Sequence, residues 1–121
     1  MYKFKVKRVQ EQNNLFLKAE EYIKRLKEVL GPISAAIYGS VVRGDFNIGS
    51  DIDIVVISDA LAKDPLERMK VLFRYTQGSE EPKGYRLNEF KRMIKQKHPT
   101  AIGIMNEGRI LVDDLKVFAP D

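Results

Sequence analysis

One short stretch constrains this chain more than any other: residues 37–58, with the sequence IYGSVVRGDFNIGSDIDIVVIS. An apolar run ends at a glycine-serine pair, a polar connection follows, and a second apolar run begins with two aspartates. This order predicts a strand, a tight turn and a second strand. Because side chains alternate along a strand, Asp51 and Asp53 leave one face of it, while the isoleucines and the valine between and after them leave the other face, toward a core.

The residue types in this stretch indicate a particular chemistry. Two carboxylates on one face repel each other, and each raises the other's pKa unless a cation lies between them. Such oxygen ligands suit Mg²⁺, which binds a few carboxylates, several waters and a substrate's phosphates. Gly39 and Ser40 offer backbone N–H groups and a hydroxyl to a phosphate. A nucleoside triphosphate site is one interpretation; solvated aspartates and a serine that caps a helical turn are the other.

Length and composition limit the remaining possibilities. The chain has 121 residues, enough for a single core, so we predict one domain over residues 1–121. The absence of cysteine excludes disulfides and thiol chemistry and agrees with a cytoplasmic location. No apolar run approaches the roughly 18 residues of a membrane span, so we expect no membrane association. The net charge of +4 fits an anionic ligand, but lysines and glutamates are interspersed, which does not favour a nucleic-acid partner.

Patterns on either side of the central stretch predict further elements. Residues 2–8 alternate apolar residues with lysine, which indicates a strand with one wet face or a frayed basic terminus. Residues 11–30 have apolar side chains spaced by three or four, as in a helix that covers a sheet, and Gly31-Pro32 ends it. Residues 33–38 are the first strand of the central stretch, and residues 41–44 could form one helical turn.

The second half of the chain alternates helices and strands. Asp64 and Pro65 begin a predicted helix that ends near Tyr75, with a buried side made of four residues: Leu66, Met69, Leu72 and Phe73. We expect a third strand near residues 78–85, helices from residue 87 or 88 and from Pro99, and a last strand over residues 109–112. Strands interleaved with helices indicate an α/β domain with helices mainly on one face of the sheet.

The central stretch resembles a known family, the minimal nucleotidyltransferases of the DNA polymerase β-like superfamily. The family motif is a glycine-serine pair, ten residues, and two aspartates separated by one residue. Here Gly39-Ser40 is followed by residues 41–50 and then by Asp51-Ile52-Asp53. Arg43, Gly44 and Ser50 match the inner part of the motif. The resemblance is specific over these residues, and it implies the nucleotidyltransferase fold, an α/β (α+β) domain with a mixed sheet of about four or five strands and helices mainly on one face.

The resemblance also implies roles for individual residues. Asp51 and Asp53 would hold two Mg²⁺ ions, and Gly39, Ser40 and Arg43 would contact the triphosphate. Ser50 would orient the carboxylates or cap the strand, and an ion pair is the structural alternative for Arg43. The family has a third carboxylate on a later strand, which activates the nucleophile or completes the second metal site. Glu81 is the best match, and Glu80 competes with it.

The acceptor of the nucleotide follows from the resemblance as well. The chain is too short to carry the additional domains with which polymerases and tRNA-modifying members bind their acceptors. Minimal archaeal and bacterial members are often paired with a helical HEPN-type protein, and as antitoxins they transfer AMP from ATP to a tyrosine of that partner. The same activity is expected here, and the sequence is also compatible with a homo-oligomer. Two alternatives stay open: nucleotidyl transfer to a small molecule such as an aminoglycoside, and a noncatalytic module that binds a nucleotide or a partner.

Overall fold

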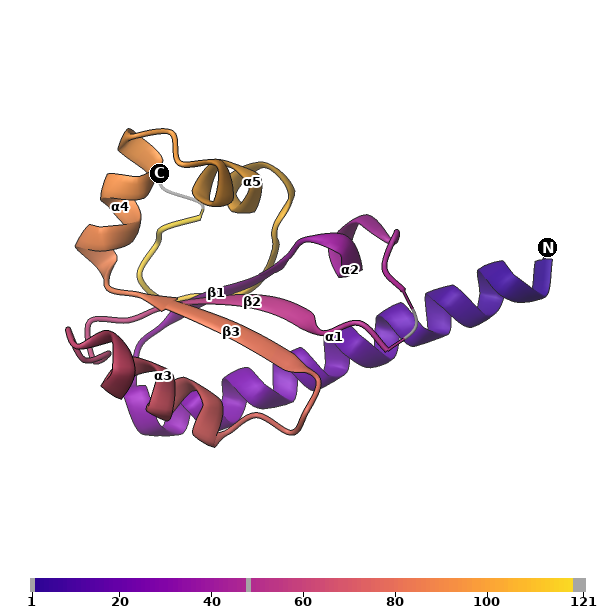
Figure 1. Ribbon diagram of the computed structural model, residues 1–121, viewed down its shortest axis with the longest axis horizontal. Coiled ribbons are helices and arrows are strands. Elements are labelled where there is room, and N and C mark those ends of the chain that lie inside the picture. The colour runs from indigo at the N-terminus through magenta and orange to yellow at the C-terminus, as the bar shows by residue number, and fades with distance from the viewer. Residues whose placement is uncertain (1, 48, 119–121) are drawn as a thin grey trace.

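The computed structural model describes residues 2–47 and 49–118, with the side chains from Val6 onward. Helices and strands alternate along it (Figure 1). Their order is α1 (Tyr2–Leu30), β1 (Ser34–Tyr38), α2 (Ser40–Arg43), β2 (Ile52–Ile57), α3 (Pro65–Arg74), β3 (Glu80–Tyr85), α4 (Leu87–Lys95), α5 (Pro99–Glu107) and β4 (Arg109–Asp113).

Within the described ranges, four strands form one mixed sheet in the order β3-β2-β1-β4. Strand β1 pairs antiparallel with β2 and with β4, whereas β2 and β3 are parallel. A parallel pair needs a crossover connection, and α3 provides it between β2 and β3. The mixed sheet predicted from the sequence is therefore confirmed, and β2 occupies an interior position with a neighbour on each side.

Helices cover both faces of this sheet, which corrects the expectation that they lie mainly on one. Helices α1 and α3 lie against one face, and α4 and α5 lie over the other (Figure 1). The apolar run of β2 explains the arrangement, because Ile54 and Val56 belong to the core under α1 while Val55 and Ile57 belong to the core under α4 and α5. A strand buried on both faces is apolar throughout rather than alternating.

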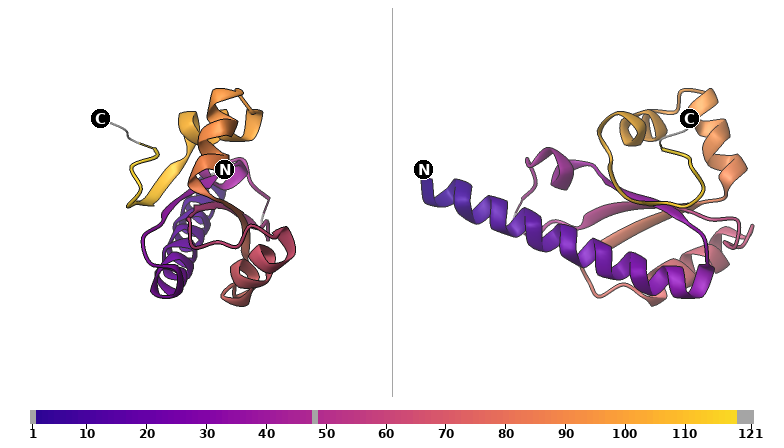
Figure 2. Two further views of the ribbon diagram at one scale, coloured as in Figure 1. Left: turned by 90° about the vertical axis from the view of Figure 1, so that its left-hand side faces the viewer. Right: turned by 180° about the vertical axis from the view of Figure 1, so that it is seen from behind.

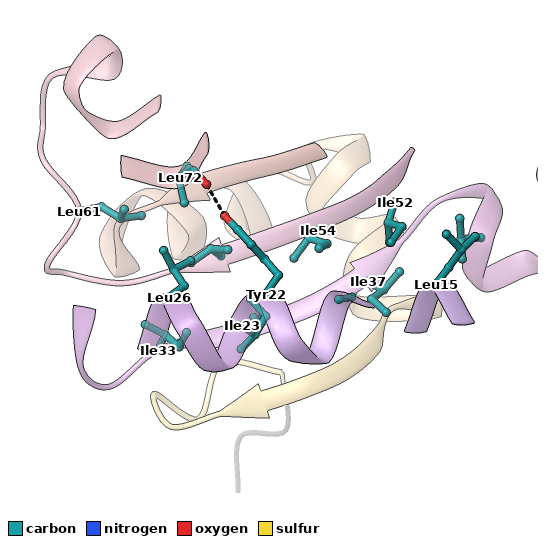
Figure 3. Close-up of a cluster of buried hydrophobic side chains, with 14 of the residues drawn as sticks. Leu15, Tyr22, Ile23, Leu26, Ile33, Ile37, Ile52, Ile54, Leu61 and Leu72 are labelled. Atoms are coloured by element: carbon teal, nitrogen blue, oxygen red, sulfur yellow. Dashed lines mark hydrogen bonds between the residues drawn. The ribbon is translucent and has the colours of Figure 1, made fainter. Parts of the chain in front are cut away.

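The larger core lies between α1 and the sheet, and a hydrogen bond at its edge joins α1 to α3 (Figure 3). Tyr22 is fully buried, and its hydroxyl donates to the carbonyl oxygen of Leu72 over 2.7 Å. One turn further along α1, the Arg25 guanidinium donates to the carbonyl oxygen of Tyr75 over 3.0 Å. Both acceptors belong to the last turn of α3 or to its cap, where carbonyl groups lack partners within the helix. These side chains therefore tie α1 to the end of α3.

We expect Tyr22→Phe to lower the free energy of unfolding by about 1–3 kcal/mol. The ring still fills its place, but the carbonyl of Leu72 is left buried without the donor that Tyr22 supplies. Urea denaturation followed by circular dichroism measures the loss. The matched control is Tyr75→Phe, since the half-buried Tyr75 accepts through its backbone and keeps that bond; a larger loss in the control would contradict the assignment.

Residues 2–10 are helical, so the prediction of a strand or of a frayed terminus over residues 2–8 is wrong. Helix α1 is 29 residues long and extends beyond the sheet past α2 (Figure 2). Arg8 donates to the carbonyl oxygens of Phe46 over 2.6 Å and of Gly44 over 3.1 Å, and its guanidinium lies 5.3 Å from the centre of the Phe46 ring. Gln12 donates to the carbonyl of Val41 over 2.7 Å. These contacts hold the extension as a helix.

None of the helices within residues 2–47 and 49–118 combines the length and the apolar character that crossing a bilayer requires.

Helix α3 has the bounds that the sequence predicts, but of the four residues predicted for its buried side only Leu72 is buried. Asp64 caps it by accepting the N–H of Glu67 over 3.0 Å, as predicted. Leu72 is buried, whereas Leu66, Met69 and Phe73 are exposed by 64%, 46% and 41%. The core is reached instead by the adjacent side of the helix, where Val71 and Leu72 contact it. Apolar spacing identified a helix with an apolar stripe, yet it did not show which side the sheet covers.

Candidate functional site

The glycine-serine turn connects β1 directly to α2 and has a conformation that requires glycine. Gly39 has φ 81° and ψ −154°, a region that is open to glycine and closed to other residues. A Cβ atom on Gly39 would lie 2.6 Å from Oδ2 of Asp53. The turn and this carboxylate are therefore in contact, although thirteen positions of the chain and the whole polar connection separate them in sequence.

Strand pairing places three polar side chains side by side across the sheet. In the register of the strands, Asp53 on β2 is opposite Tyr38 on β1 and opposite Glu81 on β3. Paired residues of neighbouring strands share a face, and this is the face on which α4 and α5 lie further along the strands. Asp51 is exposed and precedes the first residue of β2 by one position.

The electrostatics of this cluster centre on Asp53. Burial and the negative charge of Glu81 raise the pKa of the Asp53 carboxyl above its usual value, and Asp51 adds to this. Lys83 and Arg43 act in the opposite direction. A carboxylate that is partly withdrawn from water beside other negative charges is held at a free-energy cost, which a bound cation would offset.

Tyr38 is a member of the cluster that sequence analysis treated only as the end of a strand. Its hydroxyl is buried and has no hydrogen-bond partner among the described residues. Burial, followed by the charges of Asp53, Tyr85 and Glu81, raises the pKa of the Tyr38 phenol, so the group stays protonated. The signal available in the sequence was its position directly before Gly39, but a tyrosine that ends a strand is more often part of a core.

The structure separates Glu81 from Glu80. Glu81 is exposed and aligned with Asp53, while the Glu80 side chain points to the other face of the sheet and is 6% exposed. Glu80 accepts the N–H groups of Gln77 over 2.8 Å and of Ser79 over 3.1 Å, and Arg25 lies 3.7 Å away. Of the two candidates for the third carboxylate, only Glu81 lies beside Asp53.

We expect Glu80→Gln to affect mainly the stability of the protein and Glu81→Gln to affect mainly its activity. Glu80→Gln should lower the free energy of unfolding by about 1–3 kcal/mol, because it weakens charge-assisted hydrogen bonds that order the loop before β3. Glu81→Gln should leave stability nearly unchanged, since its side chain is exposed, and should lower nucleotidyl transfer. Thermal unfolding and an activity assay on the same two proteins measure both. Loss of activity in Glu80→Gln alone would contradict these assignments.

Arg43 and Ser50 have observed contacts that do not need a ligand. Nε of Arg43 lies 3.3 Å from Oδ2 of Asp45, and both side chains are largely exposed. Oγ of Ser50 accepts the N–H of Asn47 over 3.1 Å within the connection before β2. Ser50 directly precedes Asp51 in the chain, the charge of Arg43 acts on the pKa of Asp53, and both residues retain surface exposed to solvent.

The carboxylates fit a magnesium ion, judged by the chemistry of the donors. In residues 2–47 and 49–118, no three histidine, cysteine, aspartate or glutamate side chains are grouped closely enough to hold a metal by themselves. Mg²⁺ does not require such a group, because it keeps several waters and is bound by one or two carboxylates together with the phosphates of a substrate. Asp51 and Asp53 supply oxygen donors of that kind. A second ion that involves Glu81 stays a prediction.

A groove lies elsewhere on the molecule. It has a volume of about 340 Å³ and is lined by residues of α1 and of the edge strand β4, among them Lys24, Arg109 and Ile110. Neither the carboxylates nor the glycine-serine turn line it. The candidate site lies apart from this groove, at the end of the sheet where Arg43, Asp51 and Glu81 are exposed to solvent.

Comparisons with known proteins agree on one assignment. Residues 18–115 match the model of the nucleotidyltransferase domain, so the match includes the glycine-serine turn, both aspartates and Glu81. A crystal structure of a protein from Sulfolobus solfataricus, described as a nucleotidyltransferase by inference, superposes with a TM-score of 0.62. That protein is 23% identical, and the superposition covers 70% of this chain and 78% of the other, which establishes a common fold. The curated protein sequences contain no match.

Proposed function

We propose that this chain, which belongs to the nucleotidyltransferase domain family, transfers AMP from ATP to a tyrosine of a HEPN-type partner protein in a magnesium-dependent reaction. The family assignment indicates nucleotidyl transfer in general. One observation supports the more specific proposal above all: strand register brings Asp53 beside Glu81, and backbone geometry brings it against the glycine-serine turn.

The glycine-serine turn and the exposed guanidinium of Arg43 are proposed to bind the triphosphate. Backbone N–H groups of Gly39 and Ser40 and the hydroxyl of Ser40 would donate to the β- and γ-phosphates. Arg43 would contact the same phosphates from the exposed side of α2 by exchanging its weak surface pairing with Asp45 for a phosphate. These contacts orient the α-phosphorus for in-line attack by the acceptor.

The carboxylates are proposed to hold Mg²⁺ and to prepare the acceptor. When bound, Mg²⁺ would neutralise the charge that develops on the phosphoryl oxygens. Asp51 and Asp53 would be its protein ligands. Glu81, exposed at the edge of the cluster, would accept the proton of the acceptor hydroxyl as its oxygen bonds to the α-phosphorus and pyrophosphate leaves.

The exposure of the carboxylates supports a macromolecular acceptor. Asp51 and Glu81 are both exposed, so a tyrosine that projects from another protein could reach them. A small-molecule acceptor would need to be enclosed on most sides to be bound tightly. The groove between α1 and β4 does not supply that enclosure, since it lies apart from the carboxylates.

Transfer of label from ATP tests the proposal directly. The protein, Mg²⁺ and a co-encoded HEPN-type partner are incubated with ATP labelled either at the α- or at the γ-phosphate. We expect label on the partner only from α-labelled ATP, loss of label when a chelator removes Mg²⁺, and loss when the acceptor tyrosine is replaced by phenylalanine. Label from the γ-phosphate, or none with either nucleotide, would refute the transfer of AMP.

A noncatalytic binding module is the second candidate, and one observation favours it. The described acidic side chains do not form a complete set of metal ligands by themselves. Such a module would bind its partner equally well with and without Mg²⁺ and ATP, and Glu81→Gln would change neither binding nor labelling. Calorimetric titration of the partner with the wild-type protein and with this variant distinguishes the two functions.

A further inference from the structure

The outward side of α3 carries a row of large apolar side chains that nothing in the described chain covers. Leu66, Met69 and Phe73 are separated by three and four positions, so they form one stripe along the helix. Each of them is more than two-fifths exposed. Single exposed apolar residues are normal on a protein surface, but a continuous stripe on one helix is typical of an interface.

Charged side chains run parallel to this stripe in a definite order. Glu67, Lys70 and Arg74 have the same spacing of three and four positions, which places them on one flank of the stripe. All three are exposed, and Lys70 lies 3.1 Å from Glu67 within the chain. The row is acidic toward the beginning of the helix and basic toward its end.

We propose that α3 packs antiparallel against α3 of a second copy of this chain in a twofold-symmetric dimer. Antiparallel packing places Leu66 against Phe73 of the second copy and the two Met69 side chains near the axis. It also places Glu67 opposite Lys70 and Arg74 of the second copy, so opposite charges meet on the flank. In a parallel pair each flank would face the opposite flank of the second helix, so this match of Glu67 with Lys70 and Arg74 would be lost. A twofold axis gives both copies the same contacts.

The position of α3 makes this dimer compatible with the chemistry proposed above but independent of it. Helix α3 covers the face of the sheet that carries the α1 core (Figure 1). Asp53 and Glu81 pair in register on the opposite face, which also carries Val55 and Ile57. The candidate functional site of each copy would remain exposed in the dimer. One short helix per copy buries little surface, below about 1,200 Å² in total, so we expect association in the micromolar range.

Sedimentation velocity over a range of concentrations tests the proposal. The wild-type protein should pass from monomer to dimer, and Phe73→Glu or Met69→Glu should raise the dissociation constant at least tenfold with an unchanged melting temperature, since both side chains are exposed. Leu17→Glu is the matched control, because Leu17 is 56% exposed on a different helix, and it should dimerise as the wild type does. A wild type that stays monomeric up to about 1 mM, or a dimer that survives both substitutions on α3, overturns the proposal.

Charge exchange tests the antiparallel orientation separately. Glu67→Lys alone should weaken the dimer, because the whole flank of both helices becomes basic. The double exchange Glu67→Lys with Lys70→Glu should restore part of the lost association, since positions 67 and 70 would again carry opposite charges across the axis, while position 67 would still face the like charge of Arg74. Failure of the double exchange to restore association would exclude this arrangement of the two helices.

Discussion

Asp53→Asn is expected to reduce nucleotidyl transfer by about 10²–10³-fold or more without lowering the stability of the protein. The substitution keeps the shape of the side chain and removes the charge that would bind Mg²⁺. Asp53 is on an interior strand and its carboxylate lies against the glycine-serine turn that is proposed to bind the triphosphate. The α-labelled ATP assay measures the loss, and retention of partner binding by calorimetry is the control. Activity within about tenfold of the wild type would remove Asp53 from the proposed chemistry.

The same variant has a predictable dependence of stability on pH. Since the fold raises the pKa of the Asp53 carboxyl, the unfolded chain releases this proton at a lower pH than the folded protein does. In the absence of metal, wild-type stability relative to Asp53→Asn should therefore be highest at acid pH. It should fall as the pH rises past the usual aspartate value of 3.8 and level off once the folded carboxyl has ionised. Melting temperatures of both proteins across that pH range measure the difference; a relative gain in wild-type stability with rising pH would contradict it.

Gly39→Ala should impair both stability and transfer. The backbone of Gly39 is in a region that costs about 1–3 kcal/mol for a residue with a side chain, and unfolding free energy should fall by that amount. The new Cβ would also displace the Asp53 carboxylate, whose Oδ2 occupies the space 2.6 Å away. Misplacing such a group by about 1 Å can cost about 10²-fold in rate. Denaturant titration and the labelling assay measure the two effects.

Gly31→Ala is the matched control for this prediction. Gly31 also has a positive φ, of 78°, but its Cβ would meet no described atom within 4 Å. The control should therefore lose stability through backbone strain and retain transfer at temperatures where it is folded. If both variants lose transfer equally, contact between the turn and Asp53 does not govern the reaction.

The central part of the fold was predictable from sequence because its signals are local. Apolar runs, the glycine-serine turn and the Asp64-Pro65 helix start each depend on a few neighbouring residues, and the structure has β1, β2 and α3 at those places. Strand β3 was harder, because Glu80, Glu81, Pro82 and Gly84 are poor strand formers. Pairing with β2 overrides their preferences. The sequence of β3 by itself does not show that a parallel neighbour will pair with it.

The features that sequence analysis left open or missed depend on contacts between distant segments. The choice between Glu80 and Glu81 follows from the register with Asp53, and adjacent residues of a strand differ only in the face that they occupy. The first turns of α1 carry a period-two pattern, yet Arg8 finds carbonyl acceptors at residues 44 and 46, and these contacts favour the helix. The exposure of Leu66, Met69 and Phe73 depends on which side of α3 the sheet covers.

The reach of Arg8 to the carbonyl oxygens of Gly44 and Phe46 has a practical consequence. These hydrogen bonds couple the first turns of α1 to the connection between α2 and β2, which contains Asp51. An affinity tag or a deletion at the amino end would therefore disturb this connection. Weak catalysis in a preparation altered there could be mistaken for a property of the protein itself. Purification handles for enzymology are better chosen with that linkage in mind.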